Sequence, residues 1–305
     1  MKPLNILVSL TTEENDFQME QAATAQAAAA RLGVQIQIVY AGNDAVNQSQ
    51  QLFTAIQSTG ARPDGILVEP VGTGMAQAAA AAVSAGIGWG VVNRDVDYVL
   101  RLRQGARAPI FCVATDHGEV GRIQAAQIAA LVKDGGGVLY LEGPSGSGVA
   151  RARSEGMLSA VDRNIAVKVL KGDWTEQSGY HAVKSWLSLS TSRQLNIRAI
   201  SSQNDDMAIG ARRAFEEVPD MQARREWLNL PFTGCDGVAK AGLEWVRRGL
   251  LRATVVTPPP MGLALEILVD SIRSEGQPPV CTVSKPSSFP TVDALKASAY
   301  AHAAR

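Results

Sequence analysis

The N-terminal part of the chain reads NILVSL at Asn5–Leu10, FQMEQAATAQAAAARL at Phe17–Leu32 and VQIQIVY at Val34–Tyr40. The first and third segments are short apolar runs typical of buried strands, and the alanine-rich segment between them has helical spacing. A strand, a helix and a second strand in this order predict two parallel strands joined by a crossover helix.

The same alternation continues along the chain. Further apolar runs occur at Gly65–Glu69, Gly88–Asn93, Ile110–Ala114, Gly137–Glu142, Ile165–Leu170, Ile197–Ser201, Pro231–Cys235 and Arg252–Val256. Near-continuous apolar strands that alternate with helices predict an α/β fold whose parallel sheets are covered on both faces. Because 305 residues exceed the usual size of one hydrophobic core, we expect two doubly wound parallel-sheet domains of five or six strands each, joined by a hinge.

We expect the N-terminal lobe to comprise residues 1–114 and 258–290, and the C-terminal lobe to comprise residues 115–257 and 291–305. The prolines at 258, 259 and 260 suit a segment that crosses between domains, since proline stiffens the backbone and removes a hydrogen-bond donor. The helix predicted at Met261–Ser274 would then return to the first domain.

The segment Asp95–Ala108 interrupts this pattern because it is charged and has no sustained period. It predicts an irregular surface excursion. Its three basic residues, Arg101, Arg103 and Arg107, leave an anion site as an alternative to a solvated loop.

The chain carries 29 basic and 29 acidic residues, so its formal net charge is zero. Proteins that bind nucleic acid or anionic membranes ordinarily carry an excess of basic residues, and we expect no nucleic-acid partner. No apolar run approaches the roughly 18 residues that a membrane helix needs. The opening PLNILVSL precedes TTEE without a small-residue cleavage site, and we interpret it as a strand instead of a signal peptide.

The cysteines Cys112, Cys235 and Cys281 are odd in number, lie far apart and fall in predicted strands or at their edges. This pattern predicts buried free thiols and makes a disulfide framework improbable. No CxxC, HExxH or paired-histidine spacing accompanies them, so we expect no metal site.

The segment GPSGSG at Gly143–Gly148 follows a predicted strand and opens a helix, which is the setting of a phosphate-binding loop. Val149 and Ala150 stand where a P-loop needs its Lys and Ser or Thr, and Arg151 stands where a dinucleotide fingerprint needs Gly. We therefore favour a turn that presents Arg153 over nucleotide binding. The segment also lacks the last glycine of a nucleophile elbow.

The histidines, which are His117, His181 and His302, form no arguable triad, and two of the three fall in helical stretches typical of solvated or capping side chains. We expect no catalytic residue and no cofactor.

Polar side chains gather where the predicted strands end. They are Ser9 with Asn15, Phe17 and Gln18, then Asn93 and Arg94, then Asp116, then Gln203 with Asn204 and Asp205, and then Asp236. Ligands of open α/β sheets bind beyond the carboxyl ends of the strands. Amides, carboxylates and guanidinium groups satisfy sugar hydroxyls, which both donate and accept, and an aromatic face such as Phe17 or Trp174 covers the C–H side of a sugar ring.

Several segments carry a family resemblance. In chain order they are NILVSL with NDFQ, VVNRD, ARARSEGM, GDW, SSQNDDMAIGA, TGCDG and LRATVV. The chain resembles the type I periplasmic binding proteins, most of all the ribose-binding group, which shares its fold with the effector domains of lactose-repressor-type regulators. The most specific elements are QNDDMAIGA at Gln203–Ala211 and GCDG at Gly234–Gly237, and the resemblance covers nearly the whole chain.

This resemblance implies a set of ligand-binding residues, which comprises Ser9, Asn15, Phe17, Gln18, Asn93, Arg94, Arg153, Trp174, Asn204, Asp236 and Thr257. Trp174 would be the aromatic lid. Asn93 departs from the family, which usually has Asp before the arginine, and it replaces an obligate acceptor by an amide. Thr257 falls where a glutamine is common and Gln18 where a second aromatic is common, so the resemblance implies a more polar pocket.

Each of these residues has a structural alternative. The types of Asn15, Asn204 and Asp236 also favour helix N-caps. Trp174 alternatively packs between domains, and Arg153 alternatively forms a surface ion pair. Their joint fit to one cleft favours the ligand-binding interpretation.

The resemblance implies a monomeric solute-binding protein that captures a sugar or polyol by hinge closure and delivers it to the membrane subunits of an ABC importer. It implies a periplasmic location if a leader has been removed. A cytosolic sugar sensor or regulator-type domain is the alternative, favoured by the missing export signal and by the apparently free thiols. The chain shows no helix-turn-helix segment before the first strand, which disfavours a repressor.

Overall fold

The computed structural model describes residues 3–60, 62–72, 75–189 and 195–303. The chain divides into two compact units, one of residues Met1–Thr115 and Pro259–Ser284, the other of Asp116–Pro258 and Lys285–Arg305. The third crossing between units therefore follows Ser284, earlier in the chain than the boundary at residue 290 that we expected.

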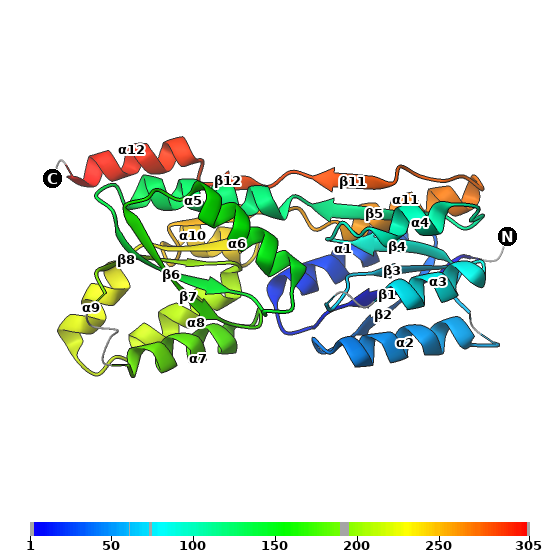
Figure 1. Cartoon of the computed structure of the whole chain (residues 1–305), viewed down its shortest axis with the longest axis horizontal. Coiled ribbons are helices and arrows are strands. Elements are labelled where there is room, and N and C mark those ends of the chain that lie inside the picture. Colours follow the sequence, from blue (N-terminus) through cyan, green and yellow to red (C-terminus); the bar gives the residue numbers. More distant parts are fainter. Residues whose placement is uncertain (1–2, 61, 73–74, 190–194, 304–305) are drawn as a thin grey trace. The chain divides into compact units, whose positions relative to one another are not determined.

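The first unit contains a six-stranded parallel sheet with the strand order β11-β5-β4-β3-β1-β2 (Figure 1). Its elements are β1 (Asn5–Leu10), α1 (Asp16–Leu32), β2 (Gln35–Tyr40), α2 (Ala45–Gln57), β3 (Gly65–Val68), α3 (Ala76–Ser84), β4 (Gly88–Val92), α4 (Tyr98–Arg103), β5 (Ile110–Thr115), α11 (Met261–Arg273) and β11 (Cys281–Ser284). Helix α11 belongs to this unit, as the sequence predicts.

The first sheet is buried on both faces. Ile6 and Val8 of β1 pack into a core with residues of α1 and α11, whereas Leu7, between them, packs into a second core with residues of α2 and α3. Successive side chains of a strand point to opposite faces. A near-continuous apolar run such as NILVSL is therefore what a doubly covered strand requires.

The second unit repeats this plan with a six-stranded sheet of order β12-β10-β9-β8-β6-β7, in which only the β10–β12 pair is antiparallel among the described strands. Its elements are α5 (His117–Leu131), β6 (Gly136–Glu142), α6 (Gly148–Ala160), β7 (Ile165–Lys171), α7 (Glu176–Leu187), β8 (Ile197–Ser202), α8 (Asp205–Glu216), α9 (Met221–Asn229), β9 (Phe232–Asp236), α10 (Gly242–Arg247), β10 (Ala253–Val256), β12 (Ser287–Phe289) and α12 (Val292–Ala303).

Close packing of α5 against α6 depends on glycine. A Cβ added to Gly121 of α5 would lie 2.0 Å from the carbonyl oxygen of Arg153 in α6, and one added to Gly156 of α6 would lie 2.1 Å from the carbonyl oxygen of Gly118. The two backbones therefore approach closely where α6 carries Arg153.

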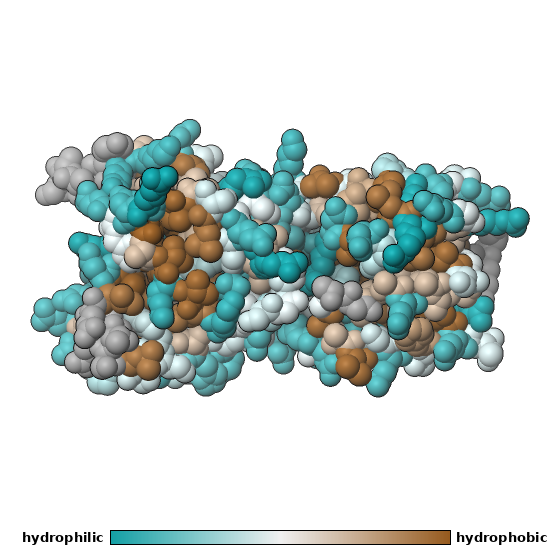
Figure 2. Space-filling model, viewed as in Figure 1, coloured by the Kyte–Doolittle hydropathy of each residue, from teal (hydrophilic) through white to brown (hydrophobic). Residues whose placement is uncertain are grey.

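The surface of both units is mixed. Figure 2 shows brown apolar groups among hydrophilic side chains, with a larger group around β6 and β7. Strand β7 is an edge of its sheet, and Val169 on it is exposed. Within the described part of the chain, no helix has the length and apolar character needed to cross a membrane.

The cysteines differ from the sequence expectation. Cys112 and Cys281 form a disulfide, so they are not free thiols; Cys235 is a buried free cysteine. The physical reason is that β5 and β11 are neighbouring parallel strands whose register places Cys112 directly opposite Cys281, although 169 residues separate them in sequence.

The segment Asp95–Ala108 also differs from the sequence expectation. It contains the short helix α4, and Tyr98 and Val99 of this helix are buried. The segment is therefore anchored to the first unit by two apolar side chains and is not wholly an irregular surface excursion.

Candidate ligand-binding site

The predicted ligand residues fall into two sets at the carboxyl ends of the strands. The first-unit set is Ser9, Asn15, Phe17, Gln18, Asn93 and Arg94, and the second-unit set is Arg153, Trp174, Asn204, Asp236 and Thr257.

The start of α1 holds three members of the first-unit set. Asn15 is the N-cap, and its Oδ1 accepts a hydrogen bond of 2.9 Å from the backbone N–H of Gln18. The cap uses only the amide oxygen, so the capping and ligand-binding interpretations of Asn15 are compatible. The Oε1 of Gln18 accepts from the backbone N–H of Thr11 at 3.3 Å, and Phe17 beside it is almost fully buried.

Ser9 stabilises the strand ends that carry the first-unit set. Its side chain is fully buried, and its hydroxyl accepts a hydrogen bond of 3.0 Å from Nε2 of Gln48. Gln48 also donates to the backbone oxygen of Glu69. Ser9 therefore ties the end of β1 to the end of β3, as a structural support of the strand ends.

Asn93 and Arg94 follow β4. Asn93 has a backbone φ of 63°, and its Nδ2 donates to Oε1 of Glu69 at 2.9 Å. Arg94 donates from one terminal nitrogen to the backbone oxygen of Gly72 at 2.8 Å, while its buried Nε has no hydrogen-bond partner among the described residues. Burial lowers the pKa of Arg94 below its usual value, and the nearby carboxylate of Glu69 partly opposes that effect.

Glu69 is a site residue that sequence reasoning missed. It is 5% exposed and follows β3 directly. One feature of the sequence could have indicated Glu69: it is the one charged residue of the run Gly65–Glu69 and stands at its carboxyl end.

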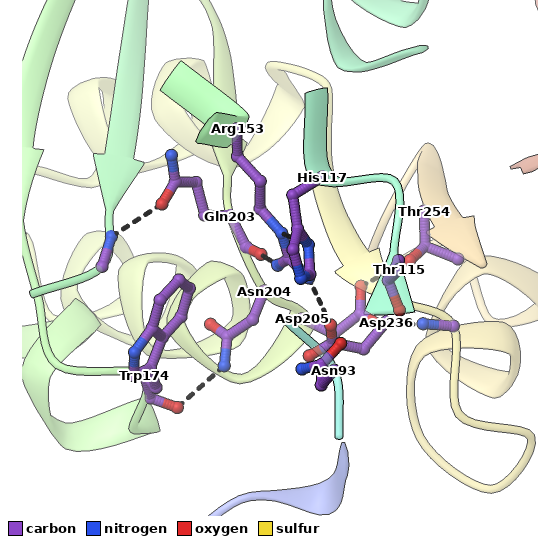
Figure 3. A network of polar contacts seen from close by, with 12 residues as sticks. Asn93, Thr115, His117, Arg153, Trp174, Gln203, Asn204, Asp205, Asp236 and Thr254 are labelled. Atoms are coloured by element: carbon purple, nitrogen blue, oxygen red, sulfur yellow. Dashed lines mark hydrogen bonds and ion pairs between the residues drawn. The ribbon is translucent and has the colours of Figure 1, made fainter. Parts of the chain in front are cut away.

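Arg153 is the centre of the second-unit set (Figure 3). Its Nε donates to Nδ1 of His117 at 3.3 Å, a terminal nitrogen donates to the backbone oxygen of Gln203, and the other lies 3.6 Å from a carboxylate oxygen of Asp236. The Arg153 side chain is only 3% exposed, so the alternative of a surface ion pair is wrong.

Gln203 fixes the surroundings of Arg153. Its Nε2 donates to the hydroxyl groups of Tyr140 and Ser154, and its Oε1 accepts from the backbone N–H of Gly143 at 3.0 Å. These buried hydrogen bonds hold the end of β8 against α6, which carries Arg153, and against β6.

Trp174 lies beside Arg153. The guanidinium carbon of Arg153 lies 5.7 Å from the centre of the Trp174 ring, within cation–π range. A Cβ on Gly143 would lie 2.2 Å from the indole, so glycine is required for this approach. Asn204 donates from Nδ2 to the backbone oxygen of Trp174 at 2.8 Å, and its Oδ1 accepts from Met207 at 3.0 Å as the N-cap of α8.

Asp236 ends β9 with a φ of 107°, and the N–H of the next residue, Gly237, donates to Asp205 at 2.8 Å. Asp205 also accepts from the hydroxyl of Thr254 at 2.7 Å. The helix that follows β9, α10, has Ala241 as its N-cap, so the alternative of Asp236 as an N-cap is wrong. Burial, together with the charge of Asp236, raises the pKa of Asp205 well above its usual range.

Thr257 follows β10, is 2% exposed, and its hydroxyl has no partner among the described residues. A buried polar atom that lacks a partner in the protein costs free energy. The same holds for the Nε of Arg94, and both residues stay predicted ligand residues.

Backbone strain marks the same positions. The non-glycine residues with left-handed φ in the described chain are Asn43, Asn93, Trp174, Asp236 and Glu275. Three of the five were predicted as ligand residues from sequence. Strained backbone clusters at functional sites, where the surrounding structure enforces it.

His117 is a second residue that sequence reasoning missed. It is buried, and it accepts the hydrogen bond from Arg153 instead of being solvated. The sulfurs of Cys112 and Cys281 lie near the carboxylate of Asp95, but because they are bonded to each other they are not metal-binding thiolates.

Chemically, each set offers both donors and acceptors, and the second adds an aromatic face. Guanidinium groups and amides donate, whereas Asp236 accepts only. Because both charge signs occur in the second set, it matches a polyhydroxyl compound better than an anion.

Comparisons with known proteins identify the family of the chain. The family described as the periplasmic binding protein domain matches residues 6–274. The ribose import binding protein of Haemophilus influenzae is 26% identical over 83% of this chain and 80% of its own length. The D-allose-binding periplasmic protein of Escherichia coli is 27% identical over 94% of this chain and 90% of its own.

A solved structure has the same fold. The ABC transporter periplasmic solute-binding protein from Actinobacillus succinogenes with bound D-allose superposes with a TM-score of 0.80, at 21% identity, over 97% of this chain and 100% of that one.

Proposed function

Because the chain belongs to the periplasmic binding protein domain family, whose members are solute-binding proteins and not enzymes, we propose that it binds a small neutral sugar or polyol as the solute-binding component of an ABC importer. The relatives named above bind ribose and D-allose by their names, which supports a ligand of this class. The ligand would contact both residue sets at once.

The observation that carries this proposal is the pairing of Arg153 with Asp236. A carboxylate beside the guanidinium disfavours an anionic ligand, because it would repel a phosphate or carboxylate group. The same carboxylate accepts hydroxyl protons from a neutral sugar while Arg153 donates to other oxygens. The indole of Trp174 would cover the C–H face of the ring.

Binding would proceed by hinge closure. A ligand that makes more contacts in the closed state than in the open one shifts the equilibrium by that difference and by no more. The division of the ligand residues between two units, with three chain crossings between them, supports this mechanism.

The disulfide between Cys112 and Cys281 supports an exported protein over the cytosolic sensor, since disulfides persist in oxidising compartments and are rare in the cytosol. It removes the free-thiol argument that favoured the sensor.

A thermal-shift screen tests the proposal. D-Ribose, D-allose, xylitol and myo-inositol represent the proposed class, and ribose 5-phosphate represents anions. A neutral ligand at about 100 times its dissociation constant raises the free energy of unfolding by about 2.7 kcal/mol. The proposal would be contradicted if ribose 5-phosphate alone stabilised the protein, or if none of the four neutral compounds did.

A further inference from the structure

Glu69 is a buried carboxylate within the first unit. Its Oε2 accepts from Nε2 of Gln21 and its Oε1 accepts from Nδ2 of Asn93, both at 2.9 Å. An ionised carboxylate accepts hydrogen bonds and donates none, and its burial is tolerated only when such donors surround it. Glu69 therefore requires an N–H group on each side.

The orientation of Gln21 is fixed independently. Gln21 is fully buried, and its Oε1 accepts a hydrogen bond of 2.9 Å from the backbone N–H of Met261, at the start of α11. Because the amide oxygen is committed to that N–H, the amide nitrogen must face Glu69. The side chain at position 69 must accordingly present an acceptor to Gln21.

The second oxygen of Glu69 determines how Asn93 is turned. An amide whose nitrogen faces a carboxylate directs its oxygen to the opposite edge of the group. Asn93 follows β4 at a left-handed φ, at the strand end where ligand residues gather. The chain of contacts thus runs from Met261 through Gln21 and Glu69 to Asn93.

We infer that Glu69 is a positioning residue of the ligand site: it fixes Asn93 with its carbonyl oxygen outward, meaning on the side away from Glu69, so that position 93 recognises a hydroxyl donor of the ligand. Glu69 also supplies the negative charge that an amide at position 93 does not carry. The ligand part of this inference rests on the proposed function, whereas the positioning part concerns the unliganded protein.

Replacing Glu69 by glutamine leaves one oxygen where the carboxylate has two. In Glu69→Gln this oxygen must accept the hydrogen bond from Gln21, so the new amide nitrogen faces Asn93. Two facing N–H groups repel. The repulsion ends only if the side-chain amide of Asn93 rotates by half a turn, which exchanges its oxygen and nitrogen and places the nitrogen outward. The predicted consequence is a reversal of hydrogen-bond polarity at position 93.

Aspartate at position 93 provides the complementary change. In Asn93→Asp alone, two carboxylates face each other in a buried site, which is unfavourable. In the double variant Glu69→Gln/Asn93→Asp, the glutamine nitrogen donates to the new carboxylate, whose second oxygen points outward as an acceptor. The double variant therefore restores both the hydrogen bond and the outward acceptor.

Urea unfolding of the unliganded variants tests the positioning. Asn93→Asp should lower the midpoint strongly, and adding Glu69→Gln should recover most of that loss. Asn43→Asp is the matched control, because Asn43 also has a left-handed φ and undergoes the same amide-to-carboxylate change; it should shift the midpoint little. If Asn93→Asp were tolerated as well as the control, or if the double variant were no better than Asn93→Asp, the inference would be overturned.

Titration with D-allose and with xylitol tests recognition separately. For whichever probe binds, Glu69→Gln should weaken affinity, Asn93→Asp should weaken it about tenfold or more at neutral pH, and the double variant should recover to within a few-fold. Equal affinities across the variants would show that Asn93 does not take part in ligand recognition. If neither probe binds the unmodified protein, the proposed function fails for these ligands, and the unfolding cycle still decides whether Glu69 positions Asn93.

Discussion

The guanidinium of Arg153 and the carboxylate of Asp236 lie 3.6 Å apart in the second unit, with exposed side-chain fractions of 3% and 8%. This separation is longer than a direct hydrogen bond. The two groups carry opposite charges, and a carboxylate can accept more than one hydrogen bond. Under the proposed function, such a pair suits a neutral ligand better than an anion.

Asp236 provides the sharpest test of sugar against anion. Replacing Asp236 by Ala should remove most sugar affinity, at a cost of about 1.5 to 3 kcal/mol for a charge-assisted hydrogen bond. Asp236→Asn should recover part of it because one acceptor remains. Isothermal titration calorimetry measures both changes. Unchanged sugar affinity in Asp236→Ala, or tighter binding of a phosphorylated ligand, would argue against a neutral-sugar site.

Arg153 should not be replaceable by lysine. A planar guanidinium contacts His117, Gln203 and Asp236 at the same time, and a single ammonium group does not reproduce that geometry. Arg153→Lys should lower the free energy of unfolding by about 1 to 3 kcal/mol and weaken sugar binding. Arg151→Lys, on the exposed face of the same helix, is the matched control and should change neither. Equal behaviour of the two variants in urea unfolding would contradict this role.

Asp205 should make stability depend on pH. Its pKa is raised chiefly by burial and also by Asp236, so the folded protein holds this proton more tightly than the unfolded chain. Its favourable contribution is then complete below the ordinary aspartate pKa, and it is lost as the pH rises toward the folded-state value. Asparagine, which does not ionise, should not show this loss.

Urea unfolding of the unmodified protein and of Asp205→Asn between pH 4 and pH 8 measures the effect. The difference in free energy of unfolding should move in favour of asparagine as the pH rises. A difference that stays constant, or that moves in favour of aspartate, would mean that the hydrogen bonds from Gly237 and Thr254 outweigh burial.

The disulfide should contribute strongly to the stability of the oxidised protein. Cys112 and Cys281 close a loop with a sequence separation of 169 residues, for which chain entropy predicts a stabilisation of about 5 kcal/mol. Cys112→Ser/Cys281→Ser should unfold at a correspondingly lower urea concentration. Thiol titration should find one reactive group in the unreduced, denatured chain, which is Cys235; three such groups would refute the disulfide.

Much of the fold was predictable because its strands are long and buried on both faces. Runs such as Asn5–Leu10 and Gly137–Glu142 are apolar over nearly their whole length, which is the pattern typical of a buried parallel strand. Strand β12 was missed, and β11 was recognised only as a strand or strand edge around Cys281, because the two strands span three and four residues, SSF and CTVS, and are only partly buried. No local pattern reveals that β11 lies beside β5, so the disulfide that depends on this register was not predictable.

The candidate site was predicted in part for a similar reason. Arg153, Asp236 and Asn204 follow strands and belong to recognisable motifs, and the structure joins the three through Gln203, Trp174 and their neighbours. Glu69 and His117 were missed because their role lies in hydrogen bonds to other polar side chains. Such contacts depend on tertiary neighbours, and sequence position alone does not specify them.

We propose that one sugar contacts the residue sets of both units. Small-angle X-ray scattering with and without the neutral ligand that gives the largest thermal shift tests this proposal most directly. We expect a smaller radius of gyration in the presence of the ligand, and no contraction in Asp236→Ala at the same ligand concentration. Saturating binding of the sugar with an unchanged radius of gyration would contradict the claim.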